Sequence, residues 1–476
     1  MVRAQRNLIQ AEFKIMTPMF LGDADRAVAA HRSMAASLKG AWRFWWRALI
    51  WPSMVSAYPK LKERLCALRD REIQLFGGPS TSGGEGRQSP IRFQFVRPPP
   101  EVLQGQRSDR AGTILYPGDG NAGLRYLGYG LIHPAGRSAG ELLRDAIAPG
   151  QTFTVKFCFA ERLRPKDRKE LLDSLKLLGL MGGLGARTRR GFGSLKLQRL
   201  TSSRNEECWS PQPALDGYCR DLGDLIADYD PAVATTLPAI TAFCKGSRVQ
   251  LKTSTGDWRS LMNWAGQRML QLRSWGYQDQ QGVHRLPTRQ EALQLFPADH
   301  DFAQQRGFDN ASGQPIDFVP ERAVFGLPHR YEKKRYFNQN RPHIPGEVYS
   351  LEVLPAAGGR RASPLLFHVH ELDGDENFTH ALVVTIFQAC FLPGAGDVAI
   401  AVSQGSASKD TSTRRLSNAE LSQVNRSRAF TPDWNLLNGF LRGRKHPARG
   451  GSELPPEPAK LDGLPNRIVV WPRPNS

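Results

Sequence analysis

Two short sequence patterns occur twice along this chain of 476 residues, in the same order. Residues 72–77 (Glu-Ile-Gln-Leu-Phe-Gly) match residues 321–326 (Glu-Arg-Ala-Val-Phe-Gly), and residues 87–93 match residues 361–367, each beginning Arg-x-Ser-Pro. The spacing from the Phe to the Ser is 13 residues in the first half and 38 in the second, so the second copy carries a 25-residue insertion. Chance could produce either match, but both in order indicate a duplicated domain.

The hydrophobic periodicity agrees with a duplication. In the first half it predicts strands at 12–16, 90–96, 151–160 and 194–200, with helices at 37–51 and 171–180. In the second half it predicts strands at 248–252, 365–370, 381–387 and 467–471, with helices at 257–272 and 434–441. Both orders are βαββαβ, the ferredoxin-like order. We therefore expect an α+β chain of two tandem ferredoxin-like (RRM-like) domains with insertions, spanning 1–203 and 204–476 and joined in the polar stretch 201–213.

The first predicted helix has one apolar and one basic face. Ser37 is a candidate N-cap. At about 100° per residue, Leu38, Trp42, Trp45 and Leu49 share one stripe, which predicts a core face, while Trp46 lies between the faces and could go either way. The opposite face carries Lys39, Arg43 and Arg47 beside Gly40, a residue that permits a close approach by another backbone or by a phosphate.

The most specific local pattern is a glycine/arginine loop at residues 182–193, between a leucine-striped helix and a strand. Glycine lets backbone N–H groups approach phosphate oxygens, and arginine neutralises their charge. The Lys-Ser/Thr ending of a P-loop is absent, and a dinucleotide fingerprint would follow a strand and precede a helix. The pattern favours an RNA or DNA backbone as ligand, with a tight surface turn as the alternative. The loop residues concerned are Gly183, Gly185, Arg187, Arg189, Arg190, Gly191 and Gly193.

The net charge also indicates a polyanionic partner. The chain has 64 Lys+Arg against 45 Asp+Glu, a formal charge of +19 and a pI of about 9.9. Arginine outnumbers lysine by 48 to 16, which suits phosphate and base contacts, although a GC-rich genome would also favour Arg codons. Two further basic stretches, 329–341 and 409–449, extend the candidate track; a solvated basic face is the alternative for each.

Composition excludes several other classes of protein. A mean hydropathy of −0.43 and the absence of a long apolar run argue against a membrane span. The six cysteines lie far apart with no CxxC pair, which argues against a zinc knuckle and a disulfide scaffold. The first twelve residues lack the apolar region of a secretory signal. We expect a cytoplasmic protein that binds no cofactor.

Four motifs together resemble the RAMP superfamily, and within it the tandem-domain subunits of the type III-B CRISPR effector (Cmr) complex. They are Met16 to Gly22 (Met-Thr-Pro-Met-Phe-Leu-Gly), Ser37-Leu-Lys-Gly40 with Arg43-Phe-Trp-Trp-Arg47, Phe76-Gly77, and the loop at 183–193. The second half resembles the family less, mainly through Phe325-Gly326 and residues 361–364.

The resemblance implies a non-catalytic RNA-binding subunit. Such a subunit would cap the 3′ end of the CRISPR RNA and help to capture the 5′ region of target RNA. Its partners would be these two RNAs, the backbone RAMP subunit and the other end-capping RAMP subunit. The RNA contacts would come from Arg32, Lys39, Arg43 and Arg47 together with the glycine/arginine loop.

Three alternatives are weighed against this interpretation. Some RAMP relatives cleave RNA without metal through a histidine, which would make His31, with Lys39 as charge stabiliser, the site of a metal-independent endoribonuclease that processes CRISPR RNA. His368 and His370 share one side of a predicted strand near Glu371, so a metal site is conceivable, and Asp23 with Asp25 is either a metal pair or a capped turn. A structural adaptor would meet only acidic proteins. No GxSxG, HExxH or Walker pattern occurs, so we predict neither a catalytic set nor a metal.

Overall fold

Contacts divide the chain into two compact units in the computed structural model. The first comprises Met1–Gln267, Leu365–Gln388 and Asn466–Ser476, and the second comprises Arg268–Pro364 and Ala389–Pro465. The structure describes residues 7–22, 30–79, 86–98, 101–106, 111–116, 121–133, 138–204, 206–273, 277–278, 284–285, 321–332, 348–355, 359–390, 392, 397–404, 428–429, 432, 434, 437–438, 441, 443–445, 460–462 and 468–473.

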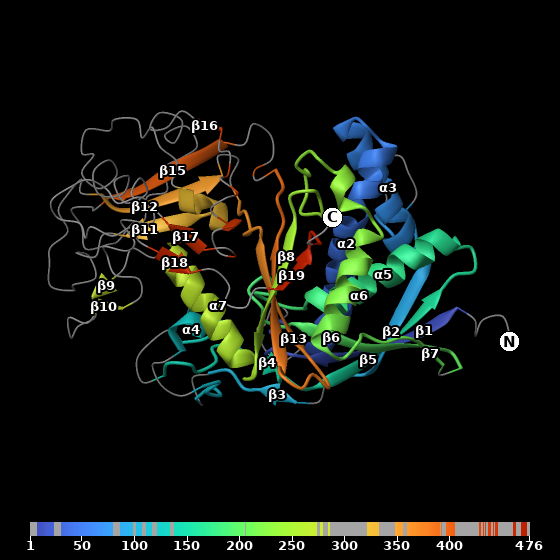
Figure 1. The fold of residues 1–476 in the computed structure, drawn as a ribbon, viewed down its shortest axis with the longest axis horizontal. Helices are drawn as coiled ribbons and strands as arrows, with labels where there is room; N and C mark the ends of the chain where they lie inside the picture. Colours follow the sequence, from blue (N-terminus) through green and yellow to red (C-terminus); the bar gives the residue numbers. More distant parts are fainter. Residues whose placement is uncertain are drawn as a thin grey trace. The chain divides into compact units, whose positions relative to one another are not determined.

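A five-stranded antiparallel sheet organises the N-terminal part of the first unit (Figure 1). Its strand order is β2-β5-β1-β6-β7. Alternate residues of β1 are buried, as expected for a strand with one face on a core. The strands are β1 (Leu8–Ile15), β2 (Ile91–Arg97), β5 (Thr152–Phe159), β6 (Leu195–Ser202) and β7 (Glu207–Trp209).

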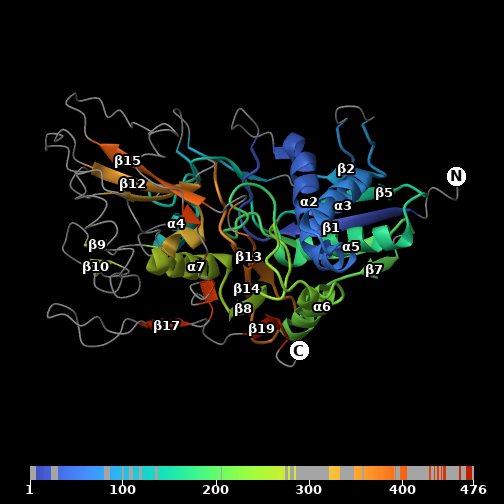
Figure 2. The same ribbon diagram turned by 90° about the horizontal axis from the view of Figure 1, so that it is seen from above.

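Helices cover one face of this sheet (Figure 2). They are α2 (Ala30–Ala57), α3 (Leu61–Phe76) and α5 (Pro165–Met181). Trp42 and Trp45 are buried, which confirms their predicted place in the core, and Trp42 Nε1 donates to the Leu171 carbonyl at 3.0 Å. Trp46 is fully buried too, with the Arg71 guanidinium 5.9 Å from its ring, so packing settles the question that periodicity left open.

A second antiparallel sheet lies in the same unit, with strand order β13-β14-β8-β19. Its strands are β8 (Arg248–Ser254), β13 (Leu365–Glu371), β14 (His380–Ile386) and β19 (Ile468–Trp471), all close to the predicted ranges. Helix α7 (Trp258–Arg273) follows β8, and the Asp257 carboxylate accepts the Arg259 N–H at 3.0 Å as a helix cap. Within the predicted helix 434–441, the four described residues are helical.

A third sheet, which the periodicity did not predict, belongs to the second unit. Its order is β11-β12-β15-β16, with β11 (His329–Glu332), β12 (Val348–Pro355), β15 (Asp397–Gln404) and β16 (Arg428–Ala429). The expected α/β mixture with antiparallel sheets is thus confirmed. The boundary between residues 203 and 204 stays a prediction. The remaining elements are β3 (Val102–Leu103), α4 (Ala122–Leu127), β4 (Ala146–Ile147), α6 (Leu215–Ala227), η2 (Pro231–Val233), β9 (Tyr277–Gln278), β10 (His284–Arg285), η4 (Glu321–Phe325), β17 (Gly443–Lys445) and β18 (Lys460–Asp462).

The two repeated motifs adopt the same local structure. Gly78 and Arg87 exchange backbone hydrogen bonds of 3.1 and 3.2 Å, and Leu327 and Arg361 exchange bonds of 2.8 and 3.0 Å. The residue before each bridge is a glycine with positive φ, 75° at Gly77 and 118° at Gly326. A Cβ on either glycine would press on the carbonyl oxygen of the partner arginine, at 2.9 and 3.1 Å respectively. The Phe-Gly and Arg-x-Ser-Pro motifs recur together because each pair forms one such bridge.

Candidate nucleic-acid interface

The glycine/arginine loop joins α5 to β6 and closes on itself. Leu184 N–H donates to the Gly193 carbonyl at 2.9 Å, and Leu195 N–H donates to the Gly182 carbonyl at 3.1 Å. Gly185 has a φ of 91°, and a Cβ there would approach the Phe20 carbonyl oxygen at 2.5 Å. This position therefore requires glycine for both its φ and its close contact. Arg187 also has a positive φ, 62°, which is uncommon for a residue with a side chain.

The motif between Met16 and Gly22 forms one wall of the loop. Ala186 N–H donates to the Phe20 carbonyl at 2.8 Å, and Gly193 N–H donates to the Pro18 carbonyl at 3.0 Å. The Thr17 hydroxyl donates to the Gly191 carbonyl at 2.7 Å. These bonds explain why the two motifs occur in one chain: the first satisfies the backbone of the second.

Strand β13, from the second repeat, supports the loop from another side. Phe367 N–H donates to the Arg189 carbonyl at 3.0 Å, and Val369 N–H donates to the Ser194 hydroxyl at 3.1 Å. His368 Nδ1 lies 2.8 Å from the Gly182 carbonyl oxygen and is placed to donate to it. The sequence did not reveal this contact, because the partners are 186 residues apart.

His368 and His370 belong to the core of this support. They are 2 % and 1 % exposed, His368 Nε2 lies 3.4 Å from His370 Nδ1, and His370 stacks on Tyr218 at 4.1 Å. Burial lowers the pKa of His368 from 6.5 to about 3 and holds the pKa of His370 well below 6.5, so both rings are neutral. Among the described residues there is no group of three or more side chains able to hold a metal.

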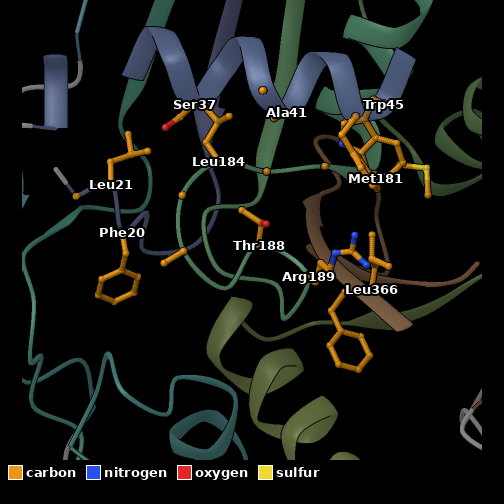
Figure 3. A pocket seen from close by; sticks show the side chains of 18 of the residues that line it. Phe20, Leu21, Ser37, Ala41, Trp45, Met181, Leu184, Thr188, Arg189 and Leu366 are labelled. Atoms are coloured by element: carbon orange, nitrogen blue, oxygen red, sulfur yellow. The ribbon is translucent and has the colours of Figure 1, made fainter. Parts of the chain in front are cut away.

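The loop and helix α2 enclose a pocket of about 550 Å³ (Figure 3). Ser37, Ala41 and Trp45 face the loop from successive turns of α2, while Arg189 and Leu366 lie on another side. Gly40 lines the same pocket, and a Cβ built on it would meet nothing within 4 Å. The remaining lining comes from Phe20, Leu21, Gly22, Phe44, Arg144, Asp145, Met181, Gly182, Gly183, Leu184, Gly185, Ala186, Thr188 and Phe367.

The three loop arginines have different surroundings. Arg189 lines the pocket, with its guanidinium carbon 5.4 Å from the centre of the Phe44 ring. Arg187 Nη2 donates to the Tyr129 carbonyl at 2.7 Å. Arg190 Nη1 donates to the Tyr126 carbonyl at 3.3 Å, and its guanidinium carbon lies 5.4 Å from the Tyr126 ring centre. Arg187 and Arg190 therefore hold the segment around α4, and neither lines the pocket.

The three residues on the basic face of α2 also differ in their partners. Arg43 Nε donates to Glu72 Oε1 at 2.5 Å, and Arg47 Nη1 donates to the same oxygen at 2.9 Å. Glu72 comes from α3, and its side chain is 9 % exposed. Lys39 is half-buried, and its ammonium has no ion-pair partner among the described residues. Of the three predicted contacts on this face, Lys39 is the one whose charge is not offset by Glu72.

Several predicted residues lie outside what the structure describes. His31 and Arg32 fall in α2, but their side chains are not among those described, and Asp23 and Asp25 lie outside the described residues. The basic stretch at 329–341 is described only through residue 332, and that at 409–449 only at isolated positions.

Backbone N–H groups complete the pocket. Gly183, Gly185 and Thr188 line it, and their N–H groups form no hydrogen bond with the described part of the chain. Arg144 and Arg189 supply positive charge, and Asp145 is the acidic residue in the lining. Backbone donors beside guanidinium groups form a site suited to a phosphate oxygen. Arg144, which carries no motif around it, was not predicted. No helix in the described part of the chain is long and apolar enough to span a membrane.

Residues 12–196 match the model of the RAMP superfamily, which confirms the resemblance expected from the motifs. No curated protein is a significant match in sequence. The apo crystal structure of Cmr1 from Pyrococcus furiosus is similar with a TM-score of 0.44 and 18 % identity, over 81 % of this chain and 89 % of that one. A chain in the cryo-EM structure of the Type III-B Cmr-beta bound to cognate target RNA has a TM-score of 0.38 and 13 % identity, over 88 % of this chain and 99 % of that one.

Proposed function

We propose that this chain, whose residues 12–196 match the RAMP superfamily, is a non-catalytic RNA-binding subunit of a type III-B CRISPR effector complex. The observation that carries the proposal is the pocket between α2 and the glycine/arginine loop. Backbone N–H groups without a partner among the described residues, two arginines and an exposed glycine line one cavity there. An RNA backbone passing over Gly40 would place a phosphate against the loop.

The chemistry of the pocket favours a polynucleotide over a mononucleotide. The loop lacks the consecutive Lys-Ser/Thr ending with which a P-loop holds a triphosphate and its magnesium. A polymer also accounts for a net charge of +19, far more than one pocket needs. Among polymers we favour single-stranded RNA, because the bases of an unpaired strand can be splayed out while its phosphates contact the loop.

The finer assignment rests on the family resemblance. We infer that the chain caps the 3′ end of the CRISPR RNA and helps to capture the 5′ region of target RNA. Its neighbours would be the backbone RAMP subunit and the other end-capping RAMP subunit, in a particle that works in the cytoplasm. The residual positive charge outside the pocket would lie along the same RNA track.

We also infer that the chain contains two tandem ferredoxin-like folds. In each sheet the first and third strands of the βαββαβ order occupy the centre, β1 with β5 and β8 with β14. The identical bridges after Gly77 and Gly326 support the same duplication. In this interpretation the second copy keeps the sheet and, through β13, supports the RNA loop of the first copy.

Our proposal assigns no cleavage to this subunit. The competing function is a metal-independent endoribonuclease that uses His31 with Lys39. Purified protein incubated with repeat RNA in EDTA should leave the RNA intact. Cleavage that His31→Ala abolishes would establish the competing function.

RNA binding itself can be tested with single arginine variants. Binding should weaken with salt, and each lost phosphate contact should flatten the log–log slope by about 0.7. We expect Arg189→Ala to lower affinity and flatten this slope. Arg92→Ala, an exposed arginine of β2 that does not line the pocket, removes the same charge as a matched control. Equal effects of the two variants would contradict the site, and unchanged binding after combined Ala substitution of Arg187, Arg189 and Arg190 would rule out the loop.

A further inference from the structure

We propose that the pocket between α2 and the glycine/arginine loop holds a whole nucleotide of the RNA, with its base stacked on the Arg189–Phe44 pair. This inference rests on the proposed function and deepens it. It adds a base contact to a site whose motif suggests only a phosphate contact.

The size of the pocket exceeds what a phosphate needs. Its volume of about 550 Å³ falls in the range of roughly 300–1,000 Å³ that is usual for sites that enclose a small organic molecule. A phosphate bound by loop N–H groups occupies only part of such a space. The rest must be filled by another part of the ligand or by water.

The lining contains both polar and apolar residues. Thr188, Arg144, Arg189 and Asp145 stand beside the loop glycines, and the apolar lining includes Leu21, Phe44, Leu184 and Leu366. A phosphate gains nothing from these apolar neighbours, whereas a nucleobase buries its faces against them. The mixed lining therefore suits a nucleotide, whose phosphate needs hydrogen-bond donors and whose base needs apolar contacts.

Arg189 and Phe44 provide a stacking surface within this lining. The guanidinium carbon of Arg189 lies 5.4 Å from the Phe44 ring centre, a cation–π pair. The Phe44 ring is itself held edge-on by Trp45 at 5.2 Å, and the Arg189 backbone is held by Phe367 N–H at 3.0 Å. Guanidinium planes and aromatic rings are the groups on which unpaired RNA bases stack. Both members of the pair are partly exposed and both line the pocket.

The position of the surface relative to the loop supports the same assignment. Thr188, whose N–H has no partner among the described residues, directly precedes Arg189 in the loop. One nucleotide could therefore meet the loop backbone with its phosphate and Arg189 with its base. Arg187 and Arg190 donate to the Tyr129 and Tyr126 carbonyls, whereas Arg189 is the loop arginine that lines the pocket.

The test compares two ligands of equal charge and length, oligouridylate and an abasic ribose–phosphate oligomer, bound to the full chain. The wild-type chain should bind oligouridylate about tenfold more tightly, as expected for loss of base–aromatic stacking. Phe44→Leu keeps an apolar side chain but removes the ring, and Arg189→Lys keeps the charge but removes the planar group. Each variant should reduce the difference in affinity between the two ligands to about twofold or less.

Phe93→Leu is the matched control, because Phe93 is a partly buried phenylalanine of β2 that does not line the pocket. It should keep the full difference between the ligands. Wild-type chain that binds both ligands equally, in a salt-dependent manner, would overturn the nucleotide assignment and leave the proposed function standing. Failure to bind either ligand would overturn both. A base preference that survives Phe44→Leu and Arg189→Lys would place the base contact elsewhere and also overturn the inference.

Discussion

Replacing Gly40 by alanine should make the protein more stable and a weaker RNA binder. Gly40 lies in the interior of α2, where glycine is about 0.8–1.0 kcal/mol less favourable than alanine. The residue is exposed, and a Cβ built on it meets nothing within 4 Å, so no clash offsets the gain. We therefore expect Gly40→Ala to raise the free energy of unfolding by about 1 kcal/mol, which is a rise of roughly 2 °C in Tm for a domain of this size.

The effect on RNA has the opposite sign. Gly40 lines the pocket, and the added methyl group would occupy space that the proposed strand uses. Displacing one phosphate from its charged hydrogen bonds costs about 1.5–3 kcal/mol. That loss lowers affinity by at least about tenfold.

Thermal denaturation and fluorescence anisotropy with labelled single-stranded RNA measure both quantities on one preparation. Ser56→Ala is the control, because it raises helix propensity on the same helix at a residue that does not line the pocket. It should raise Tm slightly and leave affinity unchanged. A Gly40→Ala protein that is more stable and binds RNA within twofold of wild type would refute the close approach at Gly40. A less stable protein would refute the helix argument.

Three further predictions concern the surroundings of the site. Gly193→Ala should lower the free energy of unfolding, measured in urea, by more than about 1–2 kcal/mol, since the φ of Gly193 is 64° and an added Cβ would overlap a loop carbonyl. Gly150 has a φ of 84° but open space around it, so Gly150→Ala should lose only the part of that free energy that comes from backbone strain. Glu72→Gln removes the charge that Arg43 and Arg47 of α2 pair with, and both arginines are about one-third exposed. The free energy of unfolding should therefore fall by about 1 kcal/mol or less, while RNA affinity stays the same or rises. A drop in RNA affinity would argue that the ion pair itself shapes the site. Burial lowers the pKa of His368 to about 3 and holds the pKa of His370 well below 6.5. Below pH 6.5 the unfolded chain therefore binds protons that the folded chain does not, so stability should be full above pH 6.5 and fall on acidification, with about 1.4 kcal/mol per pH unit from each histidine. His368→Gln should reduce the slope to the share of His370, and an undiminished pH slope would show that another group is responsible.

Individual helices, strands and the loop could be predicted because the pattern that indicates each one lies within its own residues. The leucine stripe before Gly182 predicted α5, and the hydrophobic pattern predicted a strand at 365–370 (β13) and a helix at 257–272 (α7). The glycine/arginine loop was recognisable for the same reason. Gly185 has a φ of 91°, which glycine adopts readily and other residues do not. A conformational requirement of this kind shows in the sequence as a glycine at that position.

Long-range pairing could not be predicted in this way. Helical spacing placed Arg43 and Arg47 on one face of α2, but not that Glu72 on α3, 29 and 25 residues away, would bind both. The same holds for Arg187 and Arg190, whose partners lie 58 and 64 residues away. In each case the sequence shows the number of basic residues but not which of them bind a carboxylate or carbonyl elsewhere in the chain.

The sequence by itself determined the repeated motifs, the main strands of the first two sheets, the core of α2, most of α5 and α7, and the glycine/arginine loop. Only the tertiary structure decided which basic groups face the pocket, because that depends on which helices pack together and which carboxylates they bring. It also decided that β13 of the second repeat supports the loop of the first, through His368 and the Gly182 carbonyl. Periodicity reports the burial of one element, whereas a binding site is built from surfaces that several distant elements present to one another.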